Sequence, residues 1–271
     1  MGYHKYLSGL GALSFAICVE LVTFSLLMPS LRAQSLEVSL TFPSGQDVGA
    51  PARTGGGGQR SGPGCLKGKI PLTALTPKNN LVKTVSDKAT LFVYVPETQV
   101  KSAELVVVDE EGEQYKSPVT LTKTGGIVEL SWPATLSLQT GKEYKWQLSI
   151  LCDSEDRSTE QFVRGLIQRQ PMTTPETNPE ELNKNLAALA TNPQDAKKRL
   201  MKQAEEYAQT ESWSEVLTIL ARLQQRLPND PEIADSWQEL LNSQDLAAIA
   251  TQPLVSCCTA NSQASEVRDE G

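Results

Sequence analysis

The sequence predicts an α+β protein in which a strand-rich region is followed by a helical one. Residues 65–169 carry short apolar runs with a period of two, which indicates half-buried β-strands. From residue 179 the apolar residues follow a helical period instead, which indicates amphipathic α-helices. Residues 170–178 contain two prolines and three threonines and are typical of a linker. The chain of 271 residues is long enough for two small domains.

Residues 1–33 have the layout of a secretory signal peptide. Lys5 supplies a positive charge, and a mostly apolar stretch follows from Leu7 to Met28. We expect cleavage between Ala33 and Gln34, and therefore a periplasmic or secreted protein. The rival interpretation is a membrane anchor, because the apolar stretch approaches the ~20 residues that span a bilayer. A glutamate within the stretch and a proline after it favour the signal peptide.

Composition excludes several classes of protein. Cleavage would remove His4, the only histidine, and a chain without histidine cannot run a Ser-His-Asp or Cys-His mechanism or build the usual catalytic zinc site. A net charge of -7 and a pI of about 5.0 argue against nucleic acid as a partner. We therefore predict no catalytic residue, no metal site, no cofactor and no nucleic-acid binding.

Four cysteines follow the expected cleavage site, and an even number in an exported chain suggests disulfides. Of the three possible connectivities, the simplest joins Cys65 to Cys152, which looks buried at the end of a strand. The adjacent Cys257 and Cys258 would then either bond to each other in a strained ring or each pair with another cysteine. Free thiols or pairing between chains are the alternatives. A redox role is less favoured, because redox pairs are usually spaced Cys-x-x-Cys.

Residues 34–64 begin with one alternating run, Leu36 to Phe42, and then become rich in glycine and proline. The four consecutive glycines at 55–58 lack the Gly-Lys-Ser/Thr ending of a phosphate-binding loop, so we predict a flexible exposed loop. Arg53 and Arg60 flank these glycines and could hold an anionic group through their forked donors.

Residues 65–169 predict six or seven strands separated by turn signals. Short strands at this spacing, with no helical period between them, favour an antiparallel sandwich. The last two candidates flank a polar turn, Asp153 to Ser158, and would form a long hairpin. The candidates are Lys69–Leu75, Thr90–Val95, Ala103–Val108, Tyr115–Leu121, Ile127–Trp132, Lys145–Cys152 and Gln161–Gln168.

The segment from Leu138 to Tyr144 matches the tyrosine corner of immunoglobulin-like and fibronectin-III sandwiches, in which the tyrosine hydroxyl bonds back to the chain. An ordinary glycine turn before a strand is the alternative. Trp132 and Trp146 are expected in the core, since large aromatics dominate small cores. The all-β region is therefore predicted to be an immunoglobulin/fibronectin-III-like sandwich.

Residues 179–258 predict a small α-helical domain, with Asn178 as the cap and Pro179 at the first helical position. The stretch from Ala196 to Asn229 resembles one tetratricopeptide repeat. A solenoid needs at least about three copies, so we expect a tetratricopeptide-like bundle followed by a disordered tail at residues 259–271. The charged side chains expected at its solvated exterior are Lys197, Lys198, Arg199, Glu205 and Glu206.

Several separate motifs together resemble one known family. They are Gly49-Ala50-Pro51, Arg53-Thr54, Cys65, Pro71 to Pro77, Tyr94-Val95-Pro96, Gly141-Lys142, Tyr144, Trp146, Cys152-Asp153, Asp156-Arg157-Ser158, Trp213, Pro228-Asn229, Trp237 and Cys257-Cys258. Through these motifs the chain is similar to the cyanobacterial domain-of-unknown-function family numbered 928. The resemblance implies an exported envelope protein without an assigned activity, and it adds no catalytic residue.

We therefore expect an exported, non-catalytic binding or scaffolding protein of the cell envelope, with an envelope protein or a glycan as partner and membrane contact only through an uncleaved signal. Arg53, Arg60, Asp156 and Arg157 would form a polar binding cluster or an internal salt-bridge network. The alternative is a carboxylate-dependent enzyme acting on glycans, which needs two carboxyl groups across a cleft. Its candidates, Asp109, Glu110, Glu111, Asp153, Glu155 and Asp156, gather in two turns. Calcium binding at the second turn lacks the EF-hand spacing.

Overall fold

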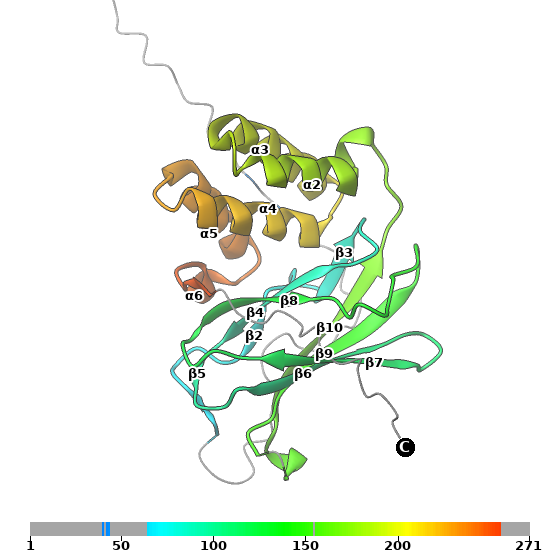
Figure 1. Cartoon of the computed structure of the whole chain (residues 1–271), viewed down its shortest axis with the longest axis vertical. Helices are drawn as coiled ribbons and strands as arrows, with labels where there is room; N and C mark the ends of the chain where they lie inside the picture. Colours follow the sequence, from blue (N-terminus) through cyan, green and yellow to red (C-terminus); the bar gives the residue numbers. More distant parts are fainter. Residues whose placement is uncertain (1–39, 41, 44–63, 154, 256–271) are drawn as a thin grey trace, which may run out of the picture. The chain divides into compact units, whose positions relative to one another are not determined.

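The computed structural model describes residues 40, 42–43, 64–153 and 155–255, all of which fall in a compact unit that begins at Val38. These residues form an α+β fold in which strands come first and helices follow (Figure 1). Two β-sheets form a sandwich-like core, and the helices pack against strands of both sheets. The change of apolar period along the sequence therefore predicted the order of the elements.

The larger sheet has five strands in the order β3-β10-β9-β6-β7. They are β3 (Leu81–Thr84), β6 (Ser102–Val108), β7 (Gln114–Thr120), β9 (Glu143–Ile150) and β10 (Gln161–Arg169). β9 and β10 form the long antiparallel hairpin, with Gly165 opposite Trp146. A Cβ atom at Gly165 would lie 2.9 Å from the indole nitrogen of Trp146, so glycine leaves the room that this indole occupies.

The smaller sheet has four strands in the order β11-β8-β4-β2. They are β2 (Thr73–Ala74), β4 (Thr90–Val95), β8 (Gly126–Ser131) and β11 (Leu254–Val255). β11 pairs in parallel with β8, and a Cβ atom at Gly126 would collide with the Val255 side chain, so a side chain at 126 would obstruct this pairing. A separate pair joins β1 (Leu66–Lys67) to β5 (Glu97–Thr98).

Five strands differ from the sequence-based expectation. Three of them, β1, β5 and β11, are two residues long each and were not expected. The strand expected at Lys69–Leu75 is reduced to Thr73–Ala74, because the chain before it passes through Pro71, which has no N–H to donate. β3 was not expected as a strand, since its four residues are too few to show a period. It lies parallel to β10 at the edge of the larger sheet.

The tyrosine at the predicted corner bonds back to the chain. The backbone N–H of Gln139 donates to the Tyr144 hydroxyl at 3.1 Å. The Tyr144 ring also meets Trp132 edge-on, with ring centroids 6.5 Å apart. Trp132 and Trp146 are both buried, which confirms their expected place in the core.

A disulfide joins Cys65, just before β1, to Cys152, just after β9. It links the two-stranded pair to the end of the larger sheet across a sequence separation of 87 residues. Both residues are half-buried, so the expectation that Cys152 is buried was wrong, because the strand ends where the hairpin leaves the sandwich. Cys257 and Cys258 lie outside the described residues.

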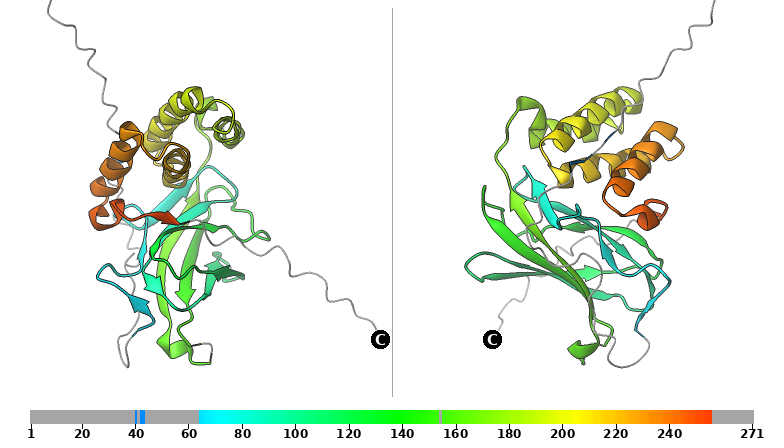
Figure 2. Two further views of the ribbon diagram at one scale, coloured as in Figure 1. Left: turned by 60° about the vertical axis from the view of Figure 1, so that its left-hand side comes forward. Right: turned by 180° about the vertical axis from the view of Figure 1, so that it is seen from behind.

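Five α-helices are described: α2 (Pro179–Ala188), α3 (Pro193–Gln209), α4 (Trp213–Arg226), α5 (Pro231–Ser243) and α6 (Ala247–Ala250). Two 3₁₀ turns, η1 (Arg157–Thr159) and η2 (Pro175–Thr177), precede them. α2, α3 and α5 each begin with proline after an Asn or Asp whose side chain accepts a backbone N–H, as expected for capped helices. Figure 2 shows the helices grouped on one side of the strands.

Lys197 corrects one expectation about the helical surface. Its side chain is only 12% exposed and pairs with Asp230 at 2.6 Å and Glu232 at 2.7 Å. It is not a solvated exterior residue, because Asp230 and Glu232 at the start of α5 hold its ammonium. Lys198 and Arg199 are exposed as expected, whereas Glu205 and Glu206 are half-buried. None of the described helices is long and apolar enough to cross a membrane.

The disulfide should make a measurable contribution to stability. Replacing both of its cysteines, Cys65→Ser with Cys152→Ser, should lower the free energy of unfolding by about 3 kcal/mol, because the unfolded chain regains the entropy of an open loop. Urea unfolding followed by tryptophan fluorescence measures this. Reductant should destabilise the wild type and leave the double variant unchanged, and equal stability of the two proteins under oxidising conditions would refute the prediction.

Candidate functional site

The helices join the strands at the first residues of α4. The indole N–H of Trp213 donates to the backbone carbonyl of Leu75 at 2.8 Å. The Phe42 ring packs edge-on against Trp213, with centroids 4.8 Å apart. The Phe42 carbonyl in turn accepts a bond from the side-chain amide of Gln244, just after α5. Trp213 therefore anchors α4 between the segment at Phe42 and the smaller sheet.

Ser214 continues this junction. Its hydroxyl accepts the backbone N–H of Thr90 at 3.1 Å and donates to the carbonyl of the same residue at 2.9 Å. One side chain thus satisfies both backbone groups at the start of β4, groups that would be costly to leave unpaired when buried. An ion pair of Arg222 with Glu129 of β8, at 2.6 Å, supports the same interface about two turns further along the helix.

Glu215 places a fully buried carboxyl at the end of β3. Its Oε1 accepts bonds from the Thr84 hydroxyl at 2.6 Å and from the backbone N–H groups of Val85 and Ser86 at 3.2 and 3.3 Å. Its Oε2 is buried without a hydrogen-bond partner among the described residues. Burial raises the pKa of this carboxyl to about 7, although the three hydrogen bonds act in the opposite direction.

Tyr207 of α3 lies within the electrostatic reach of this carboxyl. Burial, followed by the charges of Glu215 and Glu206, raises the pKa of the Tyr207 phenol above its ordinary value. The Tyr207 hydroxyl is buried and also lacks a hydrogen-bond partner among the described residues. Two polar atoms on neighbouring helices are thus held away from water at the centre of the junction.

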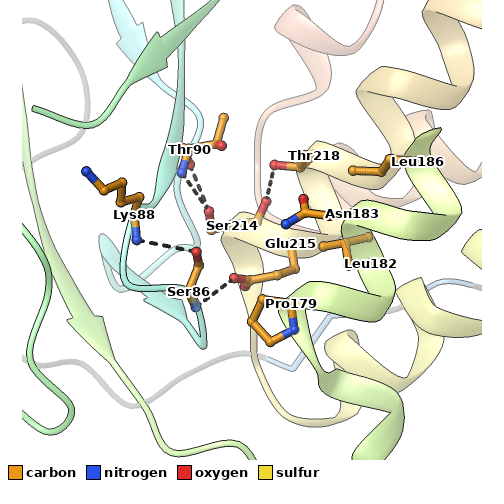
Figure 3. A pocket seen from close by; sticks show the side chains of 10 residues that line it. All are labelled: Ser86, Lys88, Thr90, Pro179, Leu182, Asn183, Leu186, Ser214, Glu215 and Thr218. Carbon is orange, nitrogen blue, oxygen red and sulfur yellow. Dashed lines mark hydrogen bonds between the residues drawn. The ribbon is translucent and has the colours of Figure 1, made fainter. Parts of the chain in front are cut away.

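A small pocket adjoins Glu215 (Figure 3). Its volume is about 90 Å³, and its walls carry the hydroxyls of Ser86, Thr90, Ser214 and Thr218. A volume of this size holds roughly three water molecules, since each takes about 30 Å³ in the liquid. The pocket therefore has room for water molecules beside the Glu215 carboxyl.

A second pocket of about 290 Å³ lies where the loop after β3, the end of β10 and the start of α2 meet. Arg169 is fixed there by bonds from its guanidinium to the carbonyls of Val85 and Leu138, at 3.2 and 3.0 Å. Asp87 and Glu180 also line this pocket. Met172 also lines this pocket. Its exposed fraction is 54%, and it is the large hydrophobic residue of the described part of the chain that is exposed to solvent.

The part of the larger sheet formed by β6, β7 and β9 lies away from the helices, whereas its edge strand β3 contacts α4 (Figure 1). Lys116 of β7 lies opposite Val106 of β6, and Val106 lies opposite Gln147 of β9. Gln147 lies opposite Arg164 of β10, so these residues form one row across four strands. The residues that alternate with them on β6, β9 and β10 are buried in the core, which shows that the row faces outward.

Three exposed cations lie on this outer face: Lys116, Lys145 and Arg164. None of them forms an ion pair with a described residue. The guanidinium of Arg164 lies over the Phe162 ring, 5.6 Å from its centroid. The face also carries two glutamates, of which Glu104 is already paired with Arg157. The outer face is thus locally cationic in a chain whose net charge is -7.

The polar cluster expected from the sequence is not assembled by the described residues. Arg53 and Arg60 lie outside them. Asp156 accepts the backbone N–H of Ser158 at 2.9 Å and caps η1, and the bonds from Ser158 lower the pKa of its carboxyl. Arg157 instead reaches Glu104, at 3.3 Å. Asp156 and Arg157 therefore have separate local partners, and neither lines a pocket described above.

The acidic residues considered for catalysis or calcium binding mostly have local partners in their turns. Asp109 accepts the N–H of Glu113, and Asp153 accepts that of Glu155. Glu110 and Glu111 bond to residues at the start of β9, through the Glu143 N–H and the Lys142 ammonium. Among the described residues no group of three or more His, Cys, Asp or Glu is placed to hold a metal ion.

Sequence reasoning missed Glu215. It stands between Trp213 and Val216, where a single acidic residue is compatible with the solvent side of an amphipathic helix. In the structure α4 is buried on nearly every side, because helices cover one side and the strands the other. The available signal was the shortage of charged residues between 213 and 221, where Glu215 is the only one, a pattern typical of a buried helix.

The raised pKa of Glu215 predicts that stability falls as pH rises from about 4.5 to 7. The unfolded chain releases this proton near the ordinary value of 4.5 and the folded chain near 7, so the folded state binds more protons between them. The loss of unfolding free energy should be about 3 kcal/mol. Urea unfolding at several pH values measures it.

Glu215→Gln keeps an acceptor oxygen for Thr84, Val85 and Ser86 and should remove most of this pH dependence. Glu113→Gln, a change at an exposed turn carboxyl, is the matched control and should retain the wild-type slope. An unchanged slope in the Glu215→Gln protein would show that another group is responsible.

Comparison with known proteins identifies a family but no activity. The model of the family described as Domain of Unknown Function (DUF928) matches residues 55–254. This range contains all the described helices and all the described strands except the last residue of β11. No curated protein and no solved structure matches the chain. Since the match spans well over half of the sequence, the chain belongs to the DUF928 family.

Proposed function

We propose that the chain is an exported, non-catalytic binding or scaffolding protein of the cell envelope. The observation that carries the proposal is the outer face of the larger sheet. It is free of described helices and holds three exposed cations without ion-pair partners. Export is supported by the signal-like residues 1–33 and by the disulfide between Cys65 and Cys152, a bond typical of oxidising compartments.

We further propose that the sandwich is immunoglobulin- or fibronectin-III-like and that the helical part is tetratricopeptide-like. An immunoglobulin- or fibronectin-III-like origin of the sandwich is supported by the bond from the Gln139 N–H to the Tyr144 hydroxyl. A tetratricopeptide-like origin of α3 and α4 is supported by the buried Ala204, Tyr207, Trp213 and Leu217. Both architectures commonly serve interactions, which supports a binding role by analogy.

The alternative, a carboxylate-dependent enzyme acting on glycans, is favoured by one observation. Asp87 and Glu180 line the same pocket of about 290 Å³. A glycosidase typically needs two carboxyl groups that face each other across a cleft. Release of reducing sugar from envelope glycans, lost in both the Asp87→Asn and the Glu180→Gln proteins, would replace the binding proposal with this one.

The binding proposal predicts a specific loss in a pull-down. The full chain, produced with its own N-terminal segment, should retain a reproducible protein or glycan from its own envelope extract, identified by mass spectrometry. The face variant, which combines Lys116→Gln, Lys145→Gln and Arg164→Gln, should lose that species, because the exposed cations of the outer face are removed.

The control variant combines Lys67→Gln, Lys123→Gln and Lys198→Gln. These lysines are exposed, form no ion pair with a described residue and lie off the outer face, so the control changes the net charge equally. It should retain the species. A wild type that retains nothing, or two variants that lose the species equally, would overturn the proposal.

A further inference from the structure

We propose that the outer face of the larger sheet binds an acidic polysaccharide, a linear glycan that bears carboxylate groups. The inference rests on the proposed binding function and names the chemistry of its ligand. It depends on three features of the face: the spacing of its cations, the stacked guanidinium of Arg164 and the polar and apolar groups between the cations.

The spacing of the cations favours a polymer. Lys116 and Arg164 stand at the two ends of a row that crosses four strands. Three steps between neighbouring strands amount to about 14 Å. A single small anion cannot bridge that distance. A chain with repeated carboxylates can meet several cations at once, and each later contact benefits from the high effective concentration set by the first.

Arg164 is the cation best prepared for a carboxylate. The Phe162 ring supports its guanidinium at 5.6 Å from the centroid, so less side-chain entropy is lost when a ligand binds. The guanidinium presents a planar fork that matches the two oxygens of a carboxylate. Lys145 lies on the adjacent β9, and its ammonium can meet a neighbouring acidic group as a point charge.

The surface between the cations suits sugar rather than nucleic acid. Gln147 is half-buried, and its side-chain amide can bond to sugar hydroxyls. Its N–H donates to the hydroxyl of the buried Ser149 at 2.9 Å, which holds the amide in place. Val106 and Val108 are half-buried and offer apolar contact. Proteins that bind single-stranded nucleic acid stack bases on free aromatic rings. The Phe162 ring is already paired with Arg164, and the chain is acidic overall.

The test measures binding of the full chain to immobilised polygalacturonate, to a neutral galactan and to single-stranded DNA. The wild type should bind polygalacturonate only, and the binding should weaken between about 0.05 and 0.5 M salt because exposed charges are screened. The face variant should bind about tenfold more weakly, as expected when three exposed ionic contacts are lost. The control variant should stay within about threefold of the wild type.

Each other outcome overturns the inference. Equal binding to the neutral galactan would show that the face does not recognise carboxylates. Equal losses of binding in the face and control variants would indicate non-specific electrostatic attraction. Tighter binding to single-stranded DNA than to polygalacturonate would show that the ligand of this face is a nucleic acid. No binding to polygalacturonate, together with an envelope protein that the face variant loses in the pull-down, would leave the proposed binding function standing with a protein partner. Thermal unfolding of each variant verifies that it is folded.

Discussion

The start of α4 is the constraint on which the rest of the structure depends. Trp213, Ser214 and Glu215 each bond to a different segment of the strands: the chain after β2, the start of β4 and the end of β3. Three consecutive side chains on a helix point in different directions. They can all reach partners only because α4 is enclosed between the other helices and the strands. A buried carboxyl is costly, and three hydrogen bonds to one of its oxygens offset part of that cost.

The two sheets differ in what they contact: the smaller sheet is bound to α4, and the larger sheet has an outer face that no described helix covers. The smaller sheet is occupied by α4, since Thr90 and Glu129 both bond to that helix. The larger sheet keeps its outer face free of described helices. The cations Lys116, Lys145 and Arg164 there have no described ion-pair partner, in contrast to the paired Lys197 and Arg222 of the helices. Charges at the junction therefore serve folding, whereas those on the outer face are available to a ligand.

The sequence predicted what depends on local pattern. The hairpin of β9 and β10, the bond of Tyr144 to its own corner and the proline-led helix starts all follow from neighbouring residues. The parallel pairing of β3 with β10 and of β11 with β8 could not be foreseen, because it joins short segments far apart in the chain. Nor could the burial of Glu215 or the outward row from Lys116 to Arg164, since each depends on which sheet face the helices cover.

Native-state hydrogen exchange tests the central claim, that the start of α4 joins helices and strands into one cooperative unit. Trp213→Phe removes the bond from the indole N–H to Leu75 while retaining an aromatic ring at this position. We predict that the substitution lowers the protection of the slowest amides in α3, α4, β4 and β8 by the same free energy. Loss of protection in the helices alone, with the strands unchanged, would show two independent domains and contradict the account.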